Sequence, residues 1–265
     1  MKEIAQSHGI NVYQPEDVND LKFIDKIKEI NPELIIVAAY GQIFSKHFIS
    51  SCNKIINIHA SLLPSYRGAA PVAHAILDDK RITGVTIISI EPKIDSGEIL
   101  DSDYLFINEN DTTGILEDRL SYLGSNITRN FVKKLINKAS INGILQDVRF
   151  VTKAPRIAKE FGLINWDQEA RQILLHVRAM QPWPTAYTFV HQENKEPTRV
   201  AVIKCSVTNE MATIKSGEVL IRDKRILVAS KNYFIEIEII HPSGKKPMTS
   251  EEYLRGIKNK ILKVQ

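Results

Sequence analysis

Cysteine is scarce in this sequence, which contains only Cys52 and Cys205 among its 265 residues. Two thiols so far apart give no disulfide framework, and no Cys-x-x-Cys pair or His-Glu-x-x-His motif is present to indicate a zinc site. We therefore expect reduced cysteines, as in an intracellular protein, and no metal site.

Long hydrophobic runs are missing as well. No apolar stretch approaches the roughly 20 residues that a membrane-spanning helix needs, and the start of the chain lacks the apolar core of a signal peptide. Neither Gly-x-Gly-x-x-Gly nor a P-loop occurs, so the sequence indicates no dinucleotide and no ATP. These absences predict a cytoplasmic protein (or, in a eukaryote, one of an organellar matrix) with no membrane partner.

Positive charge is concentrated in the C-terminal part of the chain. Residues 171–265 contain 16 Lys and Arg against 9 Asp and Glu, whereas the remaining residues contain 19 against 22. A basic half suggests a polyanionic partner. A solvated surface with surplus lysines gives the same count, so charge alone leaves both interpretations open.

The first part of the chain alternates between strand-like and helix-like segments. Short apolar runs typical of strands lie at residues 34–39, 54–59, 83–90 and 100–107. Helical spacing connects Leu21 to Ile30, and a longer apolar stripe extends from Ile115 to Leu135. This alternation predicts an α/β domain over residues 1–145, with a mostly parallel sheet between helices.

The second part of the chain has a different pattern. Residues 146–164 are broken by Pro155 and Gly162 and have no sustained period, which predicts a linker. A helix is expected at 168–180, and short strands are expected at 186–190, 199–206, 218–221, 225–229 and 233–240. A capping box at 249–252 opens a last helix. We expect residues 165–265 to form a small β-barrel.

Two polar side chains stand at the end of the 54–59 strand. Asn57 and His59 are two residues apart, so they point to the same side of the sheet. Asp95, in a turn after the 83–90 strand, adds a carboxylate near a neighbouring strand end. Amide, imidazole and carboxylate together suit acyl transfer. Taken singly, each residue also fits a turn, a cap or a structural role.

The longer motif Asn-Ile-His-x-Ser-Leu-Leu-Pro-x-x-Arg-Gly, at residues 57–68, is followed by Asp-Ser-Gly from Asp95. It resembles the formyltransferases that use 10-formyltetrahydrofolate. Further motifs resemble the members acting on methionyl-tRNA: Ala39-Tyr40-Gly41, Arg67-Gly68-Ala69-Ala70-Pro71, Ile164-Asn165-Trp166, Arg178-Ala179-Met180-Gln181-Pro182-Trp183-Pro184 and Gly244-Lys245-Lys246-Pro247-Met248. Family members begin with a further strand, helix and strand ahead of the part that matches Met1, which we expect this chain to lack.

The resemblance implies a Rossmann-like catalytic domain followed by an OB-like barrel that binds tRNA. The implied reaction moves a formyl group from 10-formyltetrahydrofolate to the α-amine of initiator methionyl-tRNA. Asn57 is expected to stabilise the negative charge that develops on the formyl oxygen. His59 is expected to act as general base, and Asp95 to orient it.

The resemblance also implies two binding surfaces. The folate is expected to lie against Tyr40, Gly41, Gln42, Ile43, Ser61, Leu62, Leu63, Pro64 and Ile94. The tRNA is expected to meet Arg67, Lys245 and Lys246. We expect a monomer. Two alternatives remain: a formyltransferase acting on a sugar-nucleotide amine, and a catalytically inactive protein that only binds tRNA.

Overall fold

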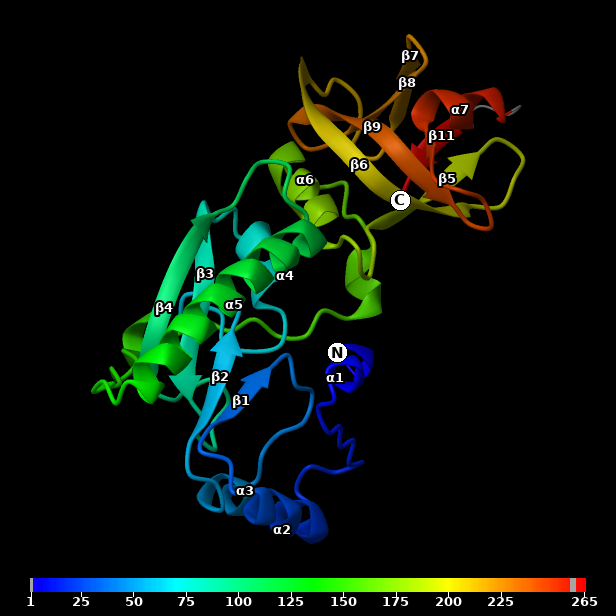
Figure 1. Ribbon diagram of the computed structural model, residues 1–265. Coiled ribbons are helices and arrows are strands. Elements are labelled where there is room, and N and C mark those ends of the chain that lie inside the picture. Colours follow the sequence, from blue (N-terminus) through cyan, green and yellow to red (C-terminus); the bar gives the residue numbers. More distant parts are fainter. Residues whose placement is uncertain (1, 258–260) are drawn as a thin grey trace.

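We describe the chain from a computed structural model, which covers residues 2–257 and 261–265. A sheet with flanking helices forms one end of the molecule, and an antiparallel barrel forms the other (Figure 1). The α/β class expected for the first part and the barrel expected for the second are both present.

The first sheet has the strand order β1-β2-β3-β4. Its strands are β1 (Ile35–Ala38), β2 (Ile55–His59), β3 (Ile82–Ser89) and β4 (Ile99–Phe106). β1 and β2 are parallel, whereas β3 is antiparallel to both β2 and β4. The loop between β3 and β4 is too short for the crossover of a dozen or more residues that parallel strands need. Among these strands, parallel pairing is therefore limited to β1 and β2.

Five helices accompany this sheet in the described part of the chain: α1 (Lys2–Ser7), α2 (Leu21–Ile30), α3 (Lys46–Ser50), α4 (Pro71–Leu77) and α5 (Thr113–Ile136). The long helix α5 packs on β3 and β4 (Figure 1). It buries Leu116, Leu120 and Phe131 on the stripe that the sequence predicts. At Gly124, a Cβ would lie 3.5 Å from the side chain of Ile58, an ordinary van der Waals distance, so the helix packs directly against the sheet there.

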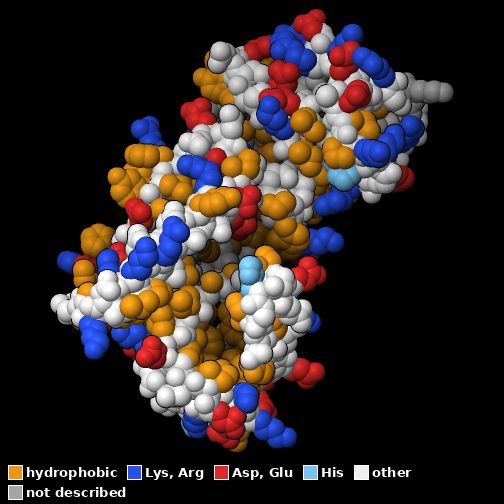
Figure 2. All heavy atoms as spheres, in the orientation of Figure 1, with side chains coloured by type: hydrophobic (Ala, Val, Ile, Leu, Met, Phe, Trp, Pro, Cys, Tyr) orange, Lys and Arg blue, Asp and Glu red, His pale blue; other side chains and the backbone are white. Residues whose placement is uncertain are grey.

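Beside β1 the molecule is hollowed. β1 pairs only with β2 among the described strands, and Ile36 on it is 43% exposed. Figure 2 shows hydrophobic side chains in a hollow between the sheet and the amino-terminal segment. The side chain of Gln42 fastens that segment by accepting from the Val18 N–H (2.8 Å) and donating to the Glu16 carbonyl (3.1 Å).

The second sheet has the order β11-β5-β6-β9-β8-β7, with β10 paired to β9. Its strands are β5 (Tyr187–Gln192), β6 (Thr198–Met211), β7 (Val219–Arg222), β8 (Arg225–Ala229), β9 (Tyr233–Pro242), β10 (Met248–Thr249) and β11 (Ile261–Val264). A bridge between Glu218 and Lys263 joins the outer strands, so the sheet closes into a barrel. Helix α7 (Ser250–Arg255) begins with the predicted capping box, formed by Thr249 and Glu252.

Helix α6 (Ala170–Ala179) joins the two parts of the molecule, because it packs on α4 as well as on β6. Buried Arg178 donates to the carbonyls of Asn108 and Asp111, both at 2.9 Å. Arg171 forms an ion pair with Asp79 at 2.6 Å. The barrel is thus attached to the first domain by directed hydrogen bonds.

No helix in residues 2–257 or 261–265 combines the length and the hydrophobicity that crossing a bilayer demands.

His176 on α6 makes stability depend on pH. Burial lowers the pKa of this imidazole below its usual 6.5, and the ring packs on Phe161 with 5.5 Å between centroids. The unfolded chain therefore binds the proton more readily, so stability falls as pH drops through about 6.5. We expect His176→Phe to flatten the fall in melting temperature between about pH 7.5 and about pH 5.5. The control is exposed His47→Phe, which should keep the wild-type slope; an equal slope in His176→Phe would contradict the assignment.

Candidate active site

Asn57, His59 and Asp95 meet at one place. Asn57 and His59 lie on the same side of β2, and the loop after β3 brings Asp95 to them. The Asn57 amide nitrogen lies 3.4 Å from Asp95 Oδ1, and His59 Nδ1 lies 3.7 Å from the same oxygen. The His59 and Asp95 side chains are 7% and 12% exposed. Tertiary structure therefore assembles the three groups that the sequence singles out.

The tautomer of His59 follows from its partner. Nε2 lies 2.9 Å from the backbone carbonyl of Tyr66. Since a carbonyl oxygen only accepts, Nε2 carries the hydrogen and donates it. In the neutral imidazole Nδ1 is then the unprotonated nitrogen, and it faces Asp95. Nδ1 is the atom that can accept a proton in this site.

Asp95 is held in an unusual conformation. Its φ is 50°, in the left-handed region that asparagine and aspartate tolerate better than most residues. Its Oδ2 accepts from the Gly68 N–H at 2.8 Å, which leaves Oδ1 directed at Asn57 and His59. At Gly97 a Cβ would lie 1.8 Å from the Ser89 carbonyl oxygen, so the turn requires glycine there.

The loop after β2 is fastened to β3 by Thr86. The Thr86 hydroxyl donates to the Ser61 carbonyl (2.6 Å) and accepts from the Leu63 N–H (3.1 Å). Ser61 and Leu63 are buried. Leu62 packs near Gly84 of β3, and the Leu63–Pro64 peptide bond is cis. The side chains of Ser61 and Leu63 thus support the loop from inside, and contact of this loop with folate remains a prediction.

The other residues expected at the folate lie near the strand ends. Tyr40 stacks on Phe44 with 5.6 Å between ring centroids, while Ile43 and Ile94 are exposed. A Cβ on Gly41 would meet nothing within 4 Å, so its backbone borders open space. Gln42 uses its amide to hold the amino-terminal segment. Contact of these residues with folate remains a prediction.

Tyr66 is a buried residue that sequence reasoning did not single out. It has a φ of 62° and donates its hydroxyl to Asp78 at 2.8 Å. Burial, reinforced by the hydrogen bond to Asp78, raises the pKa of Tyr66 well above its usual value of 10. The phenol therefore stays neutral and fixes the carbonyl that orients His59.

Gln146 and Thr152 also belong to the site, although the sequence predicts a linker there. Gln146 hydrogen-bonds Arg67, Asp95 and Gly97. Thr152 accepts from the Tyr66 N–H at 2.8 Å through its hydroxyl. The segment has no periodicity that could have revealed this role, because its contacts are made by isolated side chains. Sequence reasoning therefore missed these two residues.

The expected tRNA residues are in two different settings. Lys245 and Lys246 are exposed in the turn between β9 and β10, where Gly244 has a φ of 74°. Arg67 is 9% exposed, and its guanidinium donates to the Gln146 side chain at 3.0 and 2.7 Å. The barrel surface carries several further basic side chains (Figure 2).

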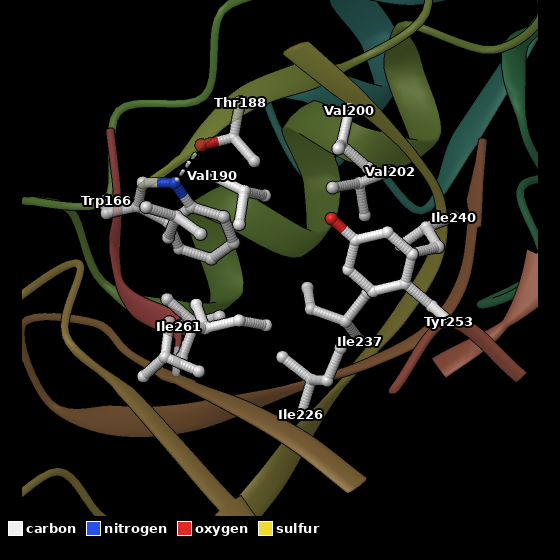
Figure 3. Close-up of a pocket in the computed structure, with 13 residues that line it drawn as sticks. Trp166, Thr188, Val190, Val200, Val202, Ile226, Ile237, Ile240, Tyr253 and Ile261 are labelled. Carbon is white, nitrogen blue, oxygen red and sulfur yellow. Dashed lines mark hydrogen bonds between the residues drawn. The ribbon is translucent and has the colours of Figure 1, made fainter. Parts of the chain in front are cut away.

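Two cavities lie in the barrel domain, away from Asn57, His59 and Asp95. The inner one has a volume of about 20 Å³, and Val190, Ile237 and other apolar side chains surround it (Figure 3). A space that could hold only about one water molecule is too small for a ligand, so we regard this cavity as a packing void. The second, of about 340 Å³, opens beside Asn165, Asp167 and Ser216. Within the described residues, no cluster of three or more His, Cys, Asp or Glu side chains could hold a metal ion.

Comparison with known proteins shows the family to which the chain belongs. Residues 2–132 match the family described as formyl transferase, and residues 156–258 match the formyl transferase C-terminal domain. A methionyl-tRNA formyltransferase of Thermodesulfovibrio yellowstonii is 37% identical over 97% of this chain and 81% of that protein. The chain belongs to the methionyl-tRNA formyltransferase family. The Bacillus subtilis family member is 36% identical over 97% of this chain and 80% of its own.

Solved structures of less similar proteins share the fold. An N-formyltransferase from Helicobacter canadensis, in complex with folinic acid and dTDP-3-aminofucose, has a TM-score of 0.65 at 21% identity, covering 89% of this chain and 81% of that one. HypX from Aquifex aeolicus, in complex with tetrahydrofolic acid, has a TM-score of 0.63 at 16% identity, covering 87% of this chain and 40% of its own. These structures show the fold, and the family assignment from the sequence motifs is confirmed by the family models and by the relatives of 36–37% identity.

His59→Ala tests the role of the imidazole. We expect formyl transfer to fall at least ~10²-fold with tRNA affinity unchanged, because a positioned acid–base group contributes that much. The measurement is turnover together with tRNA binding. His74→Ala is the matched control, since its Nε2 also lies near a backbone carbonyl, that of Pro155, at 3.1 Å. Equal turnover in the two variants would remove His59 from the mechanism.

Proposed function

We propose that this protein transfers the formyl group of 10-formyltetrahydrofolate to the α-amine of initiator methionyl-tRNA. The observation that carries the proposal is the convergence of Asn57 and His59 on one oxygen of Asp95, which lies 3.4 Å from the Asn57 amide nitrogen and 3.7 Å from His59 Nδ1. Identity of 37% to a methionyl-tRNA formyltransferase over most of both chains supports this acceptor.

Each of the three groups has a role that suits its position. The Asn57 side chain offers N–H donors to the oxygen on which negative charge develops. His59 Nδ1 takes the proton that the attacking amine loses, since Nε2 is engaged with Tyr66. Asp95 holds this arrangement by its charge and by its bond to the Gly68 N–H.

The folate supplies the formyl group and the nitrogen that leaves with a proton. We propose that it lies against the strand ends near Tyr40–Ile43 and the turn at Ile94. The donor set fits a carbonyl substrate, because an amide N–H and an imidazole face the same space. The backbone beside Gly41 borders open space, where its polar groups could hydrogen-bond the edge of the flat, polar pterin ring of the folate.

The barrel is the proposed tRNA-binding domain, with residues 146–164 as the boundary segment. Its surplus of basic residues suits phosphate contacts, which dominate tRNA affinity and make it sensitive to salt. We propose that Lys245 and Lys246 contact the tRNA backbone, and that Arg67, beside the catalytic loop, meets the acceptor end. A cytoplasmic monomer is part of this proposal.

A direct assay tests the proposed function. The protein is incubated with 10-formyltetrahydrofolate and one of three acceptors: initiator methionyl-tRNA, elongator methionyl-tRNA or an amino-sugar nucleotide. Mass spectrometry then identifies the formylated product. We expect formyl-methionine on initiator tRNA. Formylation of the sugar nucleotide alone would establish the alternative acceptor, and tRNA binding without any transfer would establish an inactive tRNA-binding protein.

A change in the β9–β10 turn tests the tRNA surface. We expect Lys245→Ala with Lys246→Ala to weaken tRNA binding and to reduce the slope of log affinity against log salt by about 2, since each phosphate contact contributes about 1. The control pair, Lys22→Ala with Lys46→Ala, lies on α2 and α3 at the opposite end of the molecule (Figure 1). Equal slopes for the two pairs would show that tRNA docks elsewhere.

A further inference from the structure

Gln146 reaches the site from a segment without helix or strand. Two residues earlier, the backbone of Ile144 exchanges hydrogen bonds with Ile99 at the start of β4, at 2.8 and 2.9 Å. This pairing brings Gln146 beside the turn that carries Asp95. The residue belongs to neither of the two surfaces proposed for folate and tRNA.

The Gln146 amide uses all of its hydrogen-bonding capacity. Its Oε1 accepts from Arg67 Nε and Nη2, at 3.0 and 2.7 Å. Its Nε2 donates to the carbonyls of Asp95 and Gly97, at 2.9 and 2.7 Å. Guanidinium groups only donate and carbonyls only accept, so the partners fix the orientation of the amide.

These four bonds hold the two segments that are joined by the hydrogen bond between Gly68 and Asp95. Asp95 Oδ2 accepts from the Gly68 N–H at 2.8 Å. Gln146 holds the backbone of Asp95 on one side of that contact and the side chain of Arg67, the residue before Gly68, on the other. The conformation it supports is unfavourable for Asp95, whose φ is 50°. Without the amide, two carbonyls of this turn lose their donor.

We propose that Gln146 is a positioning residue, which acts by holding the Asp95 carboxylate against Asn57 and His59. The inference rests on the proposed function. Its physical basis is that a misplacement of about 1 Å in an active site costs up to ~10²-fold in rate.

Two substitutions separate the parts of this role. Gln146→Met keeps the length of the side chain and removes all four hydrogen bonds. Gln146→Glu keeps the acceptor for Arg67 but faces the carbonyls of Asp95 and Gly97 with a negative charge. Gln172→Met, at an exposed position on α6, is the matched control.

The first measurement is steady-state formyl transfer. We expect both Gln146 variants to lower kcat by about 10- to 100-fold while the KM for 10-formyltetrahydrofolate stays within about threefold, because the chemistry is disturbed and the folate surface is not. The control should match wild type. A kcat within about twofold of wild type in both variants, in protein that is folded, would overturn the proposal.

The second measurement asks whether Gln146 acts through Asp95. Once the carboxylate is removed by Asp95→Asn, adding Gln146→Met should cost less than about threefold in single-turnover rate. A full additional loss in this background would show that Gln146 acts by another route and would contradict the mechanism proposed.

A third readout does not depend on activity. In wild-type protein labelled with ¹⁵N, the His59 ring nitrogens report on the nearby carboxylate. We expect Gln146→Met to shift their resonances in the same direction as Asp95→Asn. If wild-type protein formylates no acceptor, the proposed function fails while this comparison still decides the role of Gln146. Unchanged His59 resonances would overturn it.

Discussion

The hydrogen bond from the Gly68 N–H to Asp95 Oδ2, 2.8 Å long, is the contact on which the site depends. It joins the loop after β2 to the loop after β3 and satisfies one oxygen of a carboxylate that is 12% exposed, which would otherwise be costly to bury. This contact requires an unusual backbone conformation in the loop after β2. Gly68 has a φ of 128°, and a Cβ there would lie 2.5 Å from the Ala154 carbonyl oxygen.

The strands β2 and β3 and the helix α5 hold the two loops that make this contact. Residues 56–59 of β2 pair with residues 86–89 of β3, and Thr86 holds the Ser61–Leu63 turn by two hydrogen bonds. Helix α5 packs closely on both strands at Gly124. Since side chains on strands are placed more accurately than those on free loops, Asn57 and His59 serve as the fixed reference to which Asp95 is brought.

Directed polar contacts also fix the position of the barrel relative to the first domain. Arg178 donates to two backbone carbonyls of the first domain, and Arg171 pairs with Asp79 on the end of α4. The barrel therefore has a defined position relative to Asn57, His59 and Asp95. For a long polyanionic substrate this arrangement has a clear advantage, because phosphate contacts on the barrel can orient a distant reactive end without touching it.

The sequence by itself determined much of the local structure. Apolar periodicity placed β2, β3, α5 and the barrel strands β5 to β9, and the Thr249–Glu252 capping box began α7, since these follow from neighbours in the chain. The spacing of Asn57 and His59 predicted their common side, and the family motif added Asp95. Tertiary structure alone decided the antiparallel pairing of β3 with β2, the burial of Ser61 and Arg67, and the hydrogen bonds of Gln146. Those features depend on contacts between residues distant in sequence, which no local pattern encodes.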